Sequence, residues 1–411
     1  MSLLTASQWR RGPDVKRGMQ MDDRQFDTLS RRIGALTRPR LPRRTLMTTL
    51  GGASLAGALG LMLDTDAAEA RKNNKKKKCK KEGSKCDKQK CKKQDKKCCC
   101  KDLNCKNDVC EGKGPSCSTK VSFNDDFGGT GSGQGQLNEP WGITVDLSDN
   151  LYVTDTNNER VQVFTQSGGF VDEWGTEGSE NDQFQEPQGI AFNQDSEGRN
   201  RINVGDVGQP TVGRRLRKFR TDGIFEGSIG VAALTNPIGI TADENDRIWA
   251  VDSTMPGQVF LFDANGGLIF EWTPTGSGAL SNPQGIAVFK DDDENVTSVY
   301  VADSGNDRVV KFKYTSNSVD GLQFVTAAGS AGSGNSQFND PIGIVVDDCG
   351  NLWVADRLNN RVQQLNKNLS FETRIISRLN RPTGVALNND QTSLFVVNND
   401  SDLVVRFDLS K

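Results

Sequence analysis

A short motif, Pro-x-Gly followed by Ile or Val, occurs six times in the C-terminal part of this chain and constrains its fold more than any other feature. The copies begin at Pro140, Pro187, Pro237, Pro283, Pro341 and Pro382. Their glycines lie 41 to 58 residues apart, and each copy starts a unit of up to four short apolar runs separated by Gly, Asn and Asp turns. The apolar residues alternate with period two, which excludes helical repeats of similar length. The pattern therefore predicts antiparallel, four-stranded blades.

Six such units predict an all-β fold, a six-bladed β-propeller closed into a ring. The stretches PWGITVDLSDNLYVTDTNNERVQVF and PIGIVVDDCGNLWVADRLNNRVQQL resemble the NHL repeat, and the resemblance covers residues 121–411. It implies the propeller fold strongly and a particular function only weakly.

The closure of the ring is also predicted by the order of the runs. The sixth unit stops after its third run, whereas the segment before the first motif matches the fourth runs of other units. We expect Val121 to Phe127 to pair with the final strand near Leu403 to Phe407. This pairing removes a sheet edge that otherwise invites aggregation.

Charge divides the chain into three parts. Residues 1–70 carry a net charge of +4, residues 71–120 carry +13 and residues 121–411 carry −19, within a total of −2. The near-neutral total thus conceals a polycationic segment attached to an acidic body.

The first part, residues 1–70, is predicted to be an export signal. Arg43 and Arg44 precede an uncharged run, Thr48 to Leu63, and an A-x-A cleavage pattern follows at Ala68 to Ala70. The arginine pair resembles a twin-arginine signal. The run has 16 residues, fewer than the roughly 20 that a membrane span needs. An uncleaved anchor helix stays an alternative, as does a start at Met21 instead of Met1.

The second part, residues 71–120, is rich in lysine and cysteine. Nine of the ten cysteines lie there: Cys79, Cys86, Cys91, Cys98, Cys99, Cys100, Cys105, Cys110 and Cys117. Export together with this density favours disulfides, because so small a segment cannot bury a core of its own. A zinc site is the alternative, although paired C-x-x-C knuckles are absent. The lysines are predicted to bind anionic envelope polymers or, alternatively, to form a solvated spacer.

The chain contains no histidine, and this excludes several activities. Ser-His-Asp hydrolysis, histidine-bound metals and H-E-x-x-H proteases all require that residue. The strongly acidic propeller also makes nucleic acid a poor partner.

A carboxylate or amide ends the second run of every unit. These residues are Asp155, Asp206, Asp252, Asp303, Asp356 and Asn398. Antiparallel topology brings them to one rim, so calcium ligation as in gluconolactonase-like propellers is one hypothesis. Because the residue recurs in every blade, a structural role as acceptor of backbone N–H bonds is favoured.

Departures from the repeat are the candidate ligand-binding positions, since loops vary without disturbing the blades. These are Arg214, Arg215, Arg217, Met255 and Pro256, expected on upper-face loops. We therefore expect an exported platform that binds a protein or carbohydrate at the cell envelope, with no catalytic residues and no resident metal or cofactor. The alternative is a calcium-dependent hydrolase or lactonase.

Overall fold

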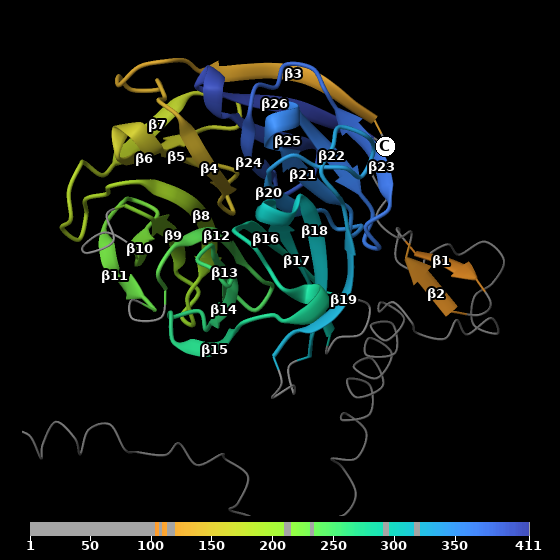
Figure 1. Cartoon of the computed structure of the whole chain (residues 1–411). Helices are drawn as coiled ribbons and strands as arrows, with labels where there is room; N and C mark the ends of the chain where they lie inside the picture. Colours follow the sequence, from red (N-terminus) through yellow and green to blue (C-terminus); the bar gives the residue numbers. More distant parts are fainter. Residues whose placement is uncertain are drawn as a thin grey trace, which may run out of the picture. The chain divides into compact units, whose positions relative to one another are not determined.

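The computed structural model describes residues 103–106, 109–112, 120–208, 215–230, 234–290, 296–315 and 321–410. Within these residues, six four-stranded antiparallel sheets form the blades of a ring (Figure 1), and the predicted all-β, six-bladed propeller is confirmed. Two further strands, β1 (Leu103–Lys106) and β2 (Val109–Gly112), pair with each other and place Cys105 opposite Cys110.

In each blade the first strand lies at the channel and the fourth lies at the periphery of the ring. Blade 1 contains β4 (Pro140–Val145), β5 (Leu151–Asp155), β6 (Arg160–Phe164) and β7 (Phe170–Trp174), and blade 2 contains β8 (Pro187–Gln194), β9 (Asn200–Asp206), β10 (Arg215–Arg220) and β11 (Phe225–Ile229). Blade 3 contains β12 (Pro237–Ala242), β13 (Ile248–Asp252), β14 (Gln258–Phe262) and β15 (Leu268–Trp272), and blade 4 contains β16 (Pro283–Lys290), β17 (Val296–Asp303), β18 (Arg308–Thr315) and β19 (Gln323–Ala328). Blade 5 contains β20 (Pro341–Val346), β21 (Leu352–Asp356), β22 (Arg361–Leu365) and β23 (Phe371–Ile375).

Blade 6 is assembled from both ends of the propeller. It contains β24 (Pro382–Leu387), β25 (Ser393–Asn398) and β26 (Leu403–Ser410), and its outer strand is β3 (Lys120–Gly128). Figure 1 shows the orange β3 alongside the blue β26. Phe127 lies opposite Val404 and Phe123 opposite Phe407, as the sequence predicts, and the pairing continues to Lys120 and Ser410.

Short 3-10 turns follow the second strands of four blades: η1 (Thr156–Asn158), η3 (Ser304–Asn306), η4 (Arg357–Asn359) and η5 (Asn399–Ser401). A further turn, η2 (Gly276–Gly278), precedes blade 4. No helix in the described part of the chain has the length and apolar character needed to cross a membrane.

The apolar core is divided among the interfaces between neighbouring blades. Among the described residues, each of six buried clusters joins two adjacent blades, and one of them joins blade 6 to blade 1. Successive residues of a strand point to opposite faces, so Tyr152 packs toward blade 2 while Val153 packs toward blade 6. The second strand of each blade is therefore buried on both sides.

The glycines of the repeated motif explain why Pro-x-Gly recurs. A Cβ atom on Gly189 would lie 1.9 Å from the Ile238 carbonyl oxygen of the next blade, and one on Gly285 would lie 2.0 Å from that of Ile342. The same contact, from Gly384 to the Trp141 oxygen at 2.7 Å, closes the circle. Only glycine permits this approach of neighbouring backbones, so the motif specifies the inner ring.

The predicted export signal with Arg43 and Arg44 lies outside the described residues. So does most of the lysine- and cysteine-rich segment, and so does Arg214. These expectations stay predictions from the sequence.

Candidate binding face

The two sides of the ring differ in which loops they carry. We call upper face the side with the Pro-x-Gly segments and the turns between second and third strands, and lower face the opposite side. The register places Pro140 opposite Asp155 and Pro341 opposite Asp356, so the repeated carboxylates do lie at the rim of the upper face. They are buried beneath that face, however, since the Asp155 and Asp356 side chains are 0% exposed.

Each repeated carboxylate or amide accepts a hydrogen bond from the loop that leads into its own blade. The backbone N–H donors are Asn138 to Asp155, Gln185 and Glu186 to Asp206, Thr235 and Asn236 to Asp252, Ser281 to Asp303, Asn339 to Asp356 and Asn380 to Asn398. A short acidic or amide side chain thereby fixes the loop at six places around the ring. These are the contacts that a structural role requires.

In blade 1 an arginine completes the arrangement. Arg160 Nε donates to Asp155 Oδ2 at 2.7 Å, and Gln162 Nε2 donates to the same oxygen at 2.9 Å. The Arg160 guanidinium also donates to the Gly133 and Gln136 carbonyls of the incoming loop. Blade 5 repeats this arrangement with Asp356, Arg361 and Gln363, and blade 4 repeats the ion pair with Asp303 and Arg308. Burial raises the pKa of Asp356 in spite of these donors.

Blade 2 places two of the predicted ligand-binding arginines differently. Arg217 is fully buried: its Nη2 lies 2.7 Å from Asp206 Oδ2, and its guanidinium stands over the Phe184 ring. Burial lowers the pKa of Arg217 to about 10 and raises that of Asp206. Arg217 is therefore unavailable to a ligand on the surface. Arg215 is half-buried and donates to the Ser179 and Glu180 carbonyls.

Blade 3 supplies two exposed predicted residues, Met255 and Pro256. Met255 is 80% exposed in the loop between β13 and β14, next to Pro256, to which it is joined by a cis peptide bond. Asp252 beneath this loop has no arginine at the equivalent position. Burial would raise its pKa, but hydrogen bonds from Thr254, Asn236 and Thr235 outweigh burial and lower it.

The channel opens on the upper face through a small cavity of about 70 Å³. The central residue of Pro-x-Gly lines this opening in five blades, as Trp141, Ile238, Gln284, Ile342 and Thr383. The aromatic member, Trp141, is half-buried and lies under the Arg357 guanidinium, 5.6 Å from its ring centre. Arg357 is held by Asp340, and the neighbouring Leu358 is 44% exposed. Sequence reasoning missed this pair, although Trp141 is the only tryptophan at its motif position.

The channel widens toward the lower face. A chamber of about 430 Å³ lies there, and Ile143, Ile190, Ile240, Ile286, Ile344 and Val385 line both it and the upper cavity. Its polar lining includes Asp348 and Gln391, which hydrogen-bond to each other. Among the described residues, no group of three or more His, Cys, Asp or Glu side chains is placed to hold a metal ion.

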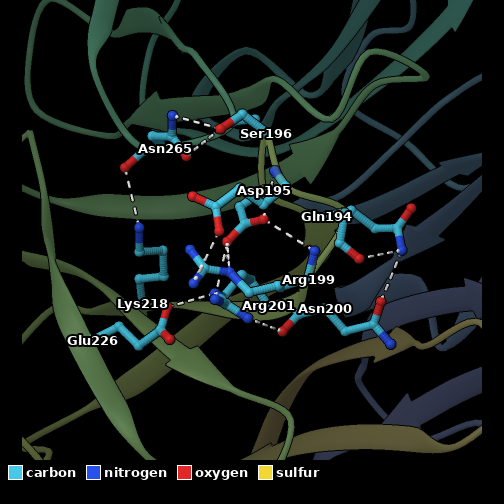
Figure 2. Close-up of polar contacts among 12 residues, drawn as sticks. Gln194, Asp195, Ser196, Arg199, Asn200, Arg201, Lys218, Glu226 and Asn265 are labelled. Atoms are coloured by element: carbon cyan, nitrogen blue, oxygen red, sulfur yellow. Dashed lines mark hydrogen bonds and ion pairs between the residues drawn. The ribbon is translucent and has the colours of Figure 1, made fainter. Parts of the chain in front are cut away.

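A second polar cluster surrounds the β8–β9 turn of blade 2 (Figure 2). Asp195 accepts from Arg199 at 2.7 Å and pairs with Arg201 at 2.9 Å, while Lys218 donates to the Asn265 carbonyl of blade 3. Burial would raise the pKa of Asp195, but the hydrogen bonds from Arg199 and Glu197 lower it to about 2. The charges in this cluster neutralise one another, so it braces blade 2 and its neighbour.

The NHL repeat profile matches residues 137–164 and 338–365, which fall in blades 1 and 5. The Drosophila melanogaster protein brain tumor is 29% identical over 155 residues, 37% of this chain and 14% of that protein. Human NHL repeat-containing protein 3 is 22% identical over 215 residues, 51% of this chain and 46% of that protein. The match thus spans less than half of each relative.

Two solved structures share the fold. A gluconolactonase from Xanthomonas campestris superposes with a TM-score of 0.51 at 16% identity, covering 72% of this chain and 99% of that one. The PQQ-bound aldose sugar dehydrogenase from Streptomyces coelicolor gives 0.50 at 14% identity, covering 71% and 98%. At such identities the likeness concerns the fold alone. Repeat profile, strand order and closure together show that the chain is a six-bladed β-propeller with NHL repeats.

Proposed function

We propose that the propeller is a binding platform whose upper face docks a protein partner. The observation that carries this proposal is the break in six-fold symmetry around the channel opening. Trp141 with Arg357 lies on one side, flanked by the exposed Leu358, and Met255 projects from blade 3. Tryptophan and arginine are enriched among the residues that dominate binding energy at protein interfaces.

The scaffold beneath this face suits a platform. The interblade loops are fixed by buried carboxylates, and the first strands are locked by the glycine ring. A surface that is already ordered loses little conformational entropy when it binds. Protein is a better fit than carbohydrate, because Arg357 covers a face of Trp141 on which a sugar would otherwise stack.

The location of the platform is proposed from the sequence. The arginine pair and uncharged run of residues 1–70 support export, and the +13 segment that follows supports attachment to anionic polymers of the envelope. In this proposal the basic segment holds the propeller at the cell surface while the upper face stays open to its partner.

The test compares exposed apolar residues on the two faces. Leu358→Asp and Met255→Asp change the upper face, whereas Leu147→Asp changes a residue of the β4–β5 turn that is 59% exposed on the lower face. A partner captured from the envelope fraction is identified by mass spectrometry, and its affinity for each purified variant is measured by calorimetry. For the upper-face variants we expect a Kd that is at least about tenfold higher, a loss of about 1.4 kcal/mol in binding free energy. We expect no change for Leu147→Asp. The reverse result would refute the proposal.

Calcium binding distinguishes the hydrolase alternative from the binding platform. A site of micromolar affinity stabilises a fold by about 4 kcal/mol when calcium is in thousandfold excess over its Kd. We expect the same melting temperature in EDTA and in millimolar calcium. A rise of several degrees, followed by turnover of a lactone, would instead favour the hydrolase.

A further inference from the structure

The outer strands of the blades are not equally protected. In each blade the far edge of the outer strand has no hydrogen-bonded neighbour among the described strands. Five of these strands carry charged residues: β3, β7, β11, β15 and β23. The sixth, β19, has the sequence QFVTAA and carries none. Edge charges prevent strands of separate molecules from pairing, and among the described outer strands only β19 lacks this protection.

The chain segments on either side of β19 and at turn η2 are also uncharged and partly apolar, although the paired strand β18 carries Lys311 and Lys313. Phe324 is 42% exposed and Val325 is 48% exposed. The sequence contains no charged residue from Gly321 to Asn339, and none from Thr273 to Phe289, which includes the adjacent turn η2. Figure 1 shows β19 at the periphery of the ring. An incoming strand therefore meets an accessible edge strand that itself carries no charge.

We propose that β19 pairs in antiparallel fashion with β19 of a second copy of this chain, so that two blades become one eight-stranded sheet. Antiparallel pairing about a two-fold axis is self-complementary for any strand. Residues 121–411 carry a net charge of −19, so two copies repel each other over most of their surface. A neutral edge is where this repulsion is weakest, whereas a cationic partner would gain more at β7, which carries Asp172 and Glu173.

The buried area of the β19–β19 interface limits the affinity of the dimer. Stable interfaces bury about 1,600 Å² in total, more than a strand of six residues contributes by itself. We therefore expect a dimer with a micromolar Kd that forms and dissociates with concentration.

The experiment is sedimentation velocity on the full chain, from about 1 to about 100 µM, with reductant present so that intermolecular disulfides do not contribute. Val325→Lys places two like charges across the two-fold axis. The matched control is Val171→Lys in β7, where Val171 is 50% exposed on an edge that is already charged. We expect the wild type and the control to dimerise, and Val325→Lys to raise the Kd at least about tenfold.

Amide hydrogen exchange gives a second readout that needs no variant. The β19 amides of the wild type should exchange more slowly at high concentration, and those of β7 should not. A wild type that stays monomeric over the whole range would overturn the proposal. So would a dimer that persists in Val325→Lys, or one that leaves exchange in β19 unchanged.

Discussion

Blades 1 and 2 bind their repeated carboxylate with arginines from different strand positions. In blade 1, Arg160 lies opposite Asp155 in the strand register and binds it through Nε. In blade 2, Arg215 lies at that register position opposite Asp206, yet the carboxylate is bound by Arg217, two residues further along. Arg217 thus replaces Gln162 of blade 1, and Arg215 Nε is buried without a hydrogen-bond partner in the described structure.

The difference separates what every blade needs from what a blade can vary. Every blade keeps the bond from a loop N–H to the acidic or amide side chain. The cation that neutralises the carboxylate changes position in blade 2, and in blade 3 none of the described residues supplies one. The anchor of the loop is therefore the fixed element. The arginine is an interchangeable support.

Removal of the carboxylate in blade 2 should have the largest effect. Asp206→Ala leaves the guanidinium of Arg217, which is 0% exposed, as an unpaired buried charge, which costs about 3 to 5 kcal/mol. Asp155→Ala should cost less, because Arg160 keeps Glu173 at 2.7 Å as a second partner. Urea denaturation of both variants measures the order. Equal losses would show that the cation contributes nothing to the difference between the blades.

Replacement of the motif glycine by alanine should destabilise blades 1 and 2 to a similar extent. A Cβ atom on Gly142 would lie 2.3 Å from the Gln188 carbonyl oxygen, and one on Gly189 would lie 1.9 Å from that of Ile238. Each Gly→Ala change forces neighbouring backbones apart, and we expect a loss of about 1 to 3 kcal/mol in unfolding experiments. Gly227→Ala in β11, with nothing within 4 Å of the new atom, is the control and should be close to neutral.

Arg217→Gln should convert blade 2 to the arrangement of blade 1. Arg215 already donates to carbonyls of the incoming loop, as Arg160 does. Its Nε has no hydrogen-bond partner in the described structure and can donate to the Asp206 carboxylate. We expect a loss of only about 1 kcal/mol, the contribution of one hydrogen bond, with Arg217→Leu costing more because no amide then reaches the carboxylate. Thermal denaturation measures the loss of stability in both variants. Equal losses would mean that Arg215 does not turn its Nε to the Asp206 carboxylate.

The smallest effect concerns pH and extends the comparison to blade 3. The lowered pKa of Asp252 contributes stability that is present above its unfolded pKa near 3.9 and is lost as pH falls toward the folded pKa. The raised pKa of Asp206 acts in the opposite direction, since the folded state binds its proton more readily. Between pH 6 and pH 3, melting temperature should fall less steeply for Asp252→Asn and more steeply for Asp206→Asn than for the wild type.

The sequence predicted the fold well because the determinants of the fold are repeated. The motif glycines specify contacts between neighbouring blades, and the acidic or amide residues mark the end of every second strand, so six copies reinforce one interpretation. The pairing of β3 with β26 followed from the same regularity. Repetition of this kind makes strand order and closure readable without coordinates.

The candidate face was predicted less completely. Arg217 was expected on a surface loop because the segment after Asp206 departs from the repeat, but the register of β10 turns it inward onto Asp206. Its position two residues after Arg215 matches Gln162 of blade 1, and this alignment was the available signal. The stack of Trp141 with Arg357 joins residues that are far apart in the sequence, and no local pattern indicates such a contact.

The shared sixth blade has a consequence for the chain during its synthesis. Asn124 of β3 and Asp408 of β26 hydrogen-bond across 284 positions. A nascent chain therefore carries β3 as a solitary strand while blades 1 to 5 emerge, and such unpaired edges are prone to wrong pairings until translation reaches β26. Closure is thus the slow, non-local step. The ring can close only after both ends of the propeller have been synthesised.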